Sequence, residues 1–221
     1  MTNSLDSRLL GPGDCFGQTF PTPGPIRCYI VRSPEPAGSA HHGEDLLIQV
    51  APKTSSGNGG PKQINVAVKS DGKGGLETDT ARISLEAGDG VLFYTSDSAA
   101  GRFAVSGAGP NFHFDSSRIE NGAVYTHVFG TPGRHKWSDI YNGALSGVVE
   151  VRDVAAKTPE DRSAWLETLK KPAAFEIKGN HCSPAAVEIV VGQTVFWSIT
   201  DSSGIAITDD ALTPSRLSSE E

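Results

Sequence analysis

Short runs in which apolar and polar residues alternate recur along most of the chain, separated by turns rich in glycine and proline. Alternation with a period of two is the pattern of a half-buried β-strand, and many short strands at close intervals are typical of an all-β sandwich. The pattern predicts strands over residues 26–32, 45–51, 63–69, 81–87, 90–96, 101–107, 123–130, 134–140, 146–152, 173–179, 186–192 and 194–200.

One segment, residues 154–171, departs from this pattern and predicts a helical linker at the surface. Thr158 is a suitable N-cap and Pro159 a suitable first helical residue, acidic residues fill the first turn, and lysines stand in the last one. Three residues form a single apolar stripe on it: Trp165, Leu166 and Leu169. We expect this helix to join two β units.

Two internal repeats organise the chain. The motif F-x-T-P-G occurs at residues 20–24 and 129–133, and "ISLEAGDGVLF" (83–93) is echoed by "VEIVVGQTVFW" (187–197). The middle of the chain thus resembles the N-terminal region in one half and the C-terminal region in the other. We therefore predict one sandwich over residues 62–153 and a second, circularly permuted copy in which residues 1–52 pair with residues 172–221. Completion of these halves by another chain through swapping stays open.

These repeats, with "GPNFHFDS" (109–116) and "YTHVFGTPGRHKWSDIYNGALSGVVEV" (125–151), carry a resemblance to the cupredoxin family, the Greek-key β-sandwiches that hold mononuclear copper. The resemblance implies two cupredoxin-like sandwiches. The family's His, Cys, His and Met ligand positions fall on Pro110, Asp139, Asn142 and Leu145, and the permuted copy offers Ile30, Ser33 and Ser203. Neither copy provides a thiolate, so the resemblance implies that no blue copper site is retained.

The emptied copper end of the sandwich is a candidate pocket. His113 and Asp139 supply an imidazole and a carboxylate for proton transfer, while Tyr141 and Asn142 supply a phenol and an amide for binding a polar small molecule. The alternative is that Asp139 and Asn142 only satisfy backbone groups of the turn.

Other reactive side chains lie elsewhere in the chain. His127 alternates with Tyr125 and Phe129 and is expected to point inward, either as a core residue or as a ligand-binding group. His181 and Cys182 are further catalytic candidates, although neighbours on a strand point to opposite faces.

A metal site is the weaker alternative. His41 and His42, next to two acidic residues, or His113 could bind a divalent metal such as copper or zinc, but a solvated loop is the simpler interpretation of residues 41–45.

Composition restricts the partners of the chain. The formal charge of −7 and the pI near 5.4 argue against nucleic acid and anionic membranes. The three cysteines show no CxxC spacing, so neither a disulfide framework nor a zinc knuckle is expected. The lack of a long apolar run predicts a cytoplasmic protein. A homodimer is left open.

Three functions are compatible with these features. The first is a copper-free, cofactor-free small-molecule enzyme of the non-redox lyase, isomerase or cyclase type, or a binder, that uses the former metal end or the interdomain cleft. The second is a metalloprotein with a site of histidines and carboxylates. The third is a structural or interaction module.

Overall fold

The computed structural model describes residues 4–32, 46–54 and 60–212 of the chain. These residues confirm the predicted all-β class, since they form seventeen strands and one α-helix, and each predicted strand overlaps an observed one. The strands are β1 (Asp14–Thr19), β2 (Gly24–Arg32), β3 (Leu46–Ala51), β4 (Gln63–Ser70), β5 (Leu76–Thr78), β6 (Arg82–Glu86), β7 (Gly90–Tyr94), β8 (Phe103–Gly109), β9 (Phe112–Asp115), β10 (Ala123–Val128), β11 (Gly133–Asp139), β12 (Ser146–Arg152), β13 (Ala173–Lys178), β14 (His181–Ser183), β15 (Ala186–Val190), β16 (Thr194–Thr200) and β17 (Ile207–Asp209).

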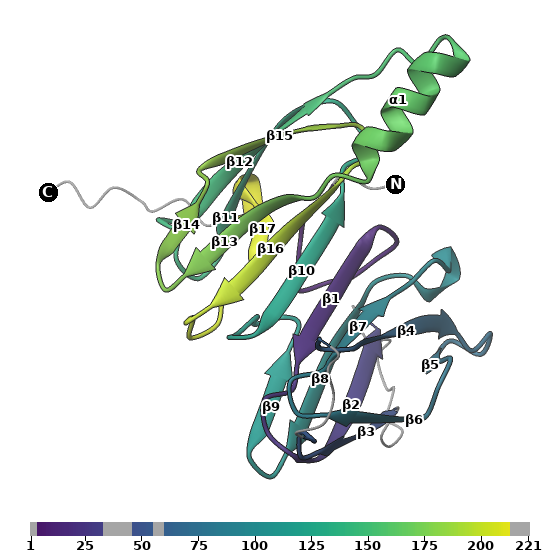
Figure 1. The fold of residues 1–221 in the computed structure, drawn as a ribbon, viewed down its shortest axis with the longest axis vertical. Coiled ribbons are helices and arrows are strands. Elements are labelled where there is room, and N and C mark those ends of the chain that lie inside the picture. Colours follow the sequence, from purple (N-terminus) through teal and green to yellow (C-terminus); the bar gives the residue numbers. More distant parts are fainter. Residues whose placement is uncertain (1–3, 33–45, 55–59, 213–221) are drawn as a thin grey trace, which may run out of the picture.

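The helix α1 (Pro159–Leu169) forms where the capping residues predict it. The Thr158 hydroxyl accepts a hydrogen bond from the Asp161 N–H at 3.1 Å, and the Asp161 carboxylate accepts one from the Thr158 N–H at 3.1 Å, which completes a capping box. The Trp165 indole N–H donates to the Val191 carbonyl at 2.9 Å and fixes the helix to the turn after β15. The helix connects β12 to β13 on the surface (Figure 1).

The strands form a β-sandwich-like arrangement of one large and two smaller sheets. The large sheet has eight strands in the order β14-β13-β16-β10-β1-β7-β4-β5, and the smaller ones have the orders β15-β12-β11-β17 and β6-β3-β2-β8-β9. Figure 1 shows β10–β17 in the upper part of the view and β1–β9 in the lower part, joined where β1 lies beside β10. Aromatic side chains fill the space between the layers in both parts, with Phe16 stacked on Phe114 and Trp137 against Trp197.

The strand pairing contradicts the predicted pairing of residues 1–52 with residues 172–221. Strand β2 pairs with β3 and β8, and β3 pairs with β6, so the N-terminal strands join the strands that directly follow them. The C-terminal strands in turn join β10, β11 and β12. The repeated motifs occur in the same order twice, so each first half is followed by its own second half and no permutation is needed.

One short segment nevertheless crosses from one part of the molecule to the other. The Ser7 hydroxyl accepts a hydrogen bond from the Ile207 N–H at 2.9 Å, next to the bridge between Asp6 and Thr208. Ser116 makes a corresponding contact inside the first part: it directly follows β9, and its hydroxyl accepts from the Val105 N–H on the neighbouring strand β8 at 2.9 Å. Each serine stands seven residues before the start of a repeated strand, β1 or β10. The N-terminal segment therefore joins the two parts, whereas the segment that carries Ser116 extends the pairing of β8 with β9.

Gly13 and Gly122 support the equivalence of β1 and β10. Each precedes one of these strands, and their φ angles of 97° and 80° lie in the left-handed region that favours glycine.

Among the described residues, no helix is long and apolar enough to span a membrane.

We expect Ser7→Ala and Ser116→Ala each to lower the free energy of unfolding by about 1–3 kcal/mol. Both hydroxyls are fully buried, and their loss leaves the N–H group of Ile207 or Val105 without an acceptor. Urea titration followed by circular dichroism measures the effect. Ser98→Ala, at an exposed position, is the control and should change stability by less than about 0.5 kcal/mol. Equal values for all three variants would contradict the role of the two buried serines.

Candidate functional site

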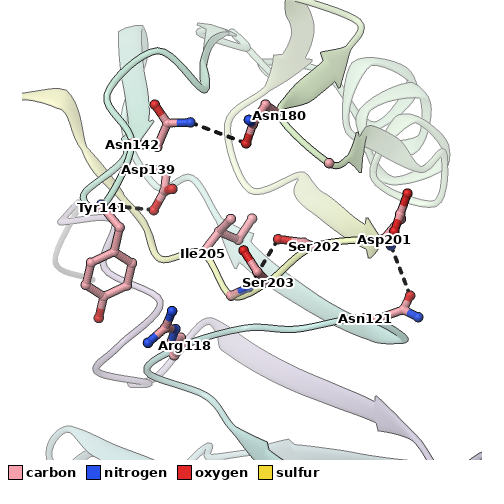
Figure 2. A pocket seen from close by; sticks show the side chains of 12 residues that line it. Arg118, Asn121, Asp139, Tyr141, Asn142, Asn180, Asp201, Ser202, Ser203 and Ile205 are labelled. Atoms are coloured by element: carbon pink, nitrogen blue, oxygen red, sulfur yellow. Dashed lines mark hydrogen bonds between the residues drawn. The ribbon is translucent and has the colours of Figure 1, made fainter.

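An open polar pocket of about 680 Å³ lies at one end of the part formed by β10–β17 (Figure 2). Its walls come from the turns that follow β11, β13 and β16, and from the segment that precedes β10. The lining residues are Arg118, Asn121, Asp139, Tyr141, Asn142, Gly179, Asn180, Asp201, Ser202, Ser203, Gly204 and Ile205. The pocket thus contains three of the predicted site residues, Asp139, Tyr141 and Asn142.

Asp139 ends β11 and holds two turns together. Its side chain is buried, and Oδ1 accepts hydrogen bonds from the N–H groups of Ala206 at 2.9 Å and Tyr141 at 3.2 Å. This is the turn-stabilising role that the sequence left as the alternative for Asp139. The carboxylate therefore fixes the turn after β11 against the segment before β17, and so shapes the pocket.

Tyr141 and Arg118 lie together at the pocket. The Tyr141 side chain is 60% exposed, and the guanidinium carbon of Arg118 lies 5.8 Å from the centre of its ring. Such a spacing gives a cation–π interaction. The stem of Arg118 passes directly over Gly204, where a Cβ atom would lie 2.6 Å from Cγ of the arginine. The position of the arginine thus depends on glycine at residue 204.

Amide side chains bridge the turns around the pocket. The Asn142 amide donates to Oδ1 of Asn180 at 3.4 Å, and Oδ1 of Asn121 accepts from the Asp201 N–H at 3.2 Å. Asn142 also accepts from the Ala144 N–H at 3.3 Å, which is again a turn contact. Asp201 has a φ of 56°, the one left-handed non-glycine residue in the described part of the chain. These contacts order the polar groups around a common space.

The two histidines that were expected to act with Asp139 lie outside the pocket. His113 is on β9 in the other part of the molecule, where its Nε2 lies 3.5 Å from Oε2 of Glu120 and its side chain is 76% exposed. His181 is exposed on β14. The expectation that His113 and Asp139 converge is therefore wrong, because β9 pairs with β8 and not with the strands around Asp139.

Cys182 also lies outside the pocket, on β14 opposite Ile177. Its Sγ is 3.6 Å from the Pro184 carbonyl oxygen, and burial raises the pKa of the thiol to about 11. Since the thiolate is the nucleophilic form, Cys182 is poorly suited to the catalytic role considered for it.

His127 is a buried residue of the sheet, in agreement with its predicted inward orientation. Its Nδ1 lies 2.6 Å from Oδ1 of Asp14, and the Tyr125 hydroxyl donates to the same oxygen at 2.8 Å. Burial and the neighbouring Asp14 raise the pKa of Tyr125 well above its usual range. Nε2 of His127 has no hydrogen-bond partner among the described residues. This cluster joins β1 to β10, away from the pocket.

The positions considered for metals are scattered. His41 and His42 lie outside the described residues, as does Ser33. Pro110 lies in the turn between β8 and β9, and Leu145 is buried in the core, so these two positions do not converge on one site. Within the described ranges, no three His, Cys, Asp or Glu side chains form a group that could hold a metal ion.

Comparison of the chain with protein-family models, curated proteins and solved structures gave no match. The geometry of the site therefore carries the functional inference. The sequence patterns had not indicated five polar residues of the pocket: Arg118, Asn121, Asn180, Asp201 and Ser202. Their signal was a set of Asn, Asp and Ser residues at strand ends, which is also the composition of ordinary turns.

We expect Cys182 to react about 100-fold more slowly with iodoacetamide at pH 8 in the native chain than in urea. A pH of 8 is below the thiol pKa in both the native and the unfolded chain. The thiolate fraction of the native chain is therefore tenfold lower for each unit by which its thiol pKa exceeds the ordinary value of 9.0. The native rate should rise about tenfold per pH unit towards pH 10. Peptide mapping by mass spectrometry gives the rate at this cysteine, and a native rate within threefold of the unfolded rate at pH 8 would contradict the pKa shift.

Asp14→Ala should lower the free energy of unfolding by about 3–5 kcal/mol, because it leaves the buried His127 imidazole and Tyr125 hydroxyl without their shared acceptor. Urea denaturation measures this loss. Glu77→Ala, on the exposed edge strand β5, removes a carboxylate without a buried partner and should change stability by less than about 0.5 kcal/mol. A loss below about 1 kcal/mol for Asp14→Ala would show that the cluster is not a structural link.

Proposed function

We propose that this chain binds a small, neutral, polyhydroxylated molecule in the pocket lined by Arg118, Asp139, Tyr141, Asn142 and Asn180. The observation that carries the proposal is the convergence of amide, hydroxyl, carboxylate and guanidinium groups from four separate segments on one open space. A volume of about 680 Å³ lies within the usual range of about 300–1,000 Å³ for ligand sites.

The chemistry of the lining favours hydroxyl groups as ligands. A hydroxyl both donates and accepts hydrogen bonds, so it can pair with the amides of Asn121 and Asn180, with the Ser203 hydroxyl and with the Asp201 carboxylate. The exposed ring of Tyr141 offers an apolar surface for the C–H groups of such a molecule. One guanidinium and two carboxylates give the lining no excess of positive charge, which argues against a strongly anionic ligand.

Binding is better supported than catalysis. His113, His181 and Cys182, three of the four groups considered for proton transfer or nucleophilic attack, lie outside the pocket. Oδ1 of Asp139, the fourth group, accepts two backbone hydrogen bonds. The polar groups that face the pocket are suited to orienting a ligand rather than to acid–base chemistry at neutral pH.

At the level of the fold, we infer two cupredoxin-like Greek-key sandwiches in tandem, one built from β1–β9 and one from β10–β17. The equivalent strand orders β5-β4-β7-β1 and β14-β13-β16-β10 in the large sheet support this inference. Asp139 and Asn142, two of the four positions on which the family's copper ligands fall, line the pocket at one end of the second sandwich.

Isothermal titration calorimetry with a panel of monosaccharides, disaccharides and linear polyols tests the proposal. We expect saturable binding of at least one neutral compound, and Asn180→Ala should raise its Kd about fivefold to tenfold, because it removes one hydrogen bond worth about 1 kcal/mol. Heat release on titration of the unaltered chain provides the reference.

Asn111→Ala is the matched control, since Asn111 is an exposed asparagine in the turn between β8 and β9, outside the pocket. Its Kd should equal that of the unaltered chain. Absence of binding across the neutral panel, or equal weakening by both substitutions, would overturn the proposal. Binding of carboxylic acids alone would assign the pocket to anions instead.

A further inference from the structure

The eight-stranded sheet has an outer face that the two smaller sheets do not cover. Residues of its four central strands β7, β1, β10 and β16 alternate between the buried core and this face, where Phe196 is 36% exposed. The outward positions are Gly90, Leu92, Tyr94, Cys15, Gly17, Thr19, Val124, Thr126, Val128, Thr194, Phe196, Ser198 and Thr200. None of them is charged, although charged residues make up 20% of the chain.

Charged residues occur on the strands that flank this uncharged centre. Lys69 stands on β4, and Glu176 and Lys178 stand on β13, all three exposed at positions that continue the outward rows. An uncharged centre with a charged rim is the anatomy of a protein–protein interface, whose core is depleted of charged residues relative to the rest of the surface.

The centre of the face is a shallow trough with a cavity volume of about 430 Å³. Cys15 and Gly17 on β1 form its floor together with Val124, and Leu92 and Phe196 stand on either side. A Cβ atom at residue 17 would lie 3.3 Å from Cδ1 of Leu92, so glycine keeps the floor low. The trough and the side chains that project beside it give the face the depressions and projections through which two packed sheets interdigitate.

We propose that this face is the interface of a homodimer, in which two copies of the chain pack their eight-stranded sheets against each other. Strands about 4.8 Å apart and about 20 Å long give eight strands a plane on the order of 700 Å². Because side chains project from this plane, the accessible area is larger than the plane itself and approaches the roughly 800 Å² per partner of a standard stable interface.

The edges of the sheet also favour association through the face. The sheet ends in β5 and β14, each of three residues, and strands this short offer few free backbone groups to another chain. The rim carries both signs of charge, with Glu176 and Lys178 on β13 and Lys69 on β4 at the opposite flank, as a surface that meets its own copy requires.

The oligomeric state of the full chain tests the proposal. Sedimentation equilibrium from about 1 μM to about 500 μM should show a reversible dimer. Phe196→Lys should raise its dissociation constant about 30-fold, the equivalent of roughly 2 kcal/mol for a central contact. Ser198→Arg, which adds a charge at a polar position of the same face without removing an apolar side chain, should act in the same direction if Phe196→Lys impairs folding.

Leu166→Lys on α1 is the matched control, because Leu166 is 48% exposed and lies away from this face. It should leave the dissociation constant unchanged. Alkylation of Cys15 by a maleimide should slow as the concentration of the unaltered chain rises, while that of Cys182 on the edge strand β14 should not.

Three results would overturn the proposal. A chain that stays monomeric at all concentrations has no such interface, and a dimer that tolerates both Phe196→Lys and Ser198→Arg associates through another surface. A monomer in which Cys15 is nevertheless protected has its face covered by a segment of the same chain or by a bound small molecule.

Discussion

The antiparallel pairing of β1 with β10 is the interaction on which the rest of the structure depends. It converts two four-stranded halves into one eight-stranded sheet. The Asp14–His127 contact lies across this pair in the buried layer, so separation of the halves would expose a carboxylate and an imidazole that now satisfy each other. The pairing of β10 with β16 and the bridge between Ile119 and Ile205 place the segment before β10 beside the turn after β16, and so bring Arg118 and Asn121 to the pocket.

The local elements could be predicted from the sequence because they depend on local patterns. The period-two alternation located the strands, and Thr158 with Pro159 located the start of α1. Strand partnership was not predicted, since an apolar alternation is compatible with many partners. The repeats of residues 20–24 and 129–133 were recognised, but their order was interpreted as a permutation. Pairing between neighbours in sequence, as in β2 with β3, would have required only the shorter loops that most folds use.

The residues of the candidate site could likewise be predicted only where they are neighbours in the sequence. Asp139, Tyr141 and Asn142 belong to a single turn, so one motif located all three. Asn180 and Asp201 reach the pocket only through the packing of β13 and β16, which no local pattern shows. His113 was misplaced for the converse reason, because the strand that carries it completes the other half of the molecule.

The N-terminal segment adds a second contact between the halves, because the Ser7 hydroxyl accepts from the Ile207 N–H of the second half. The Ser116 hydroxyl accepts from the Val105 N–H inside the first half and so extends the pairing of β8 with β9. The polar pocket lies in the turns at the end of the second half. The pocket and the trough share no lining residue. The proposed ligand site at the strand ends and the proposed interface on the sheet face can therefore vary independently on one scaffold.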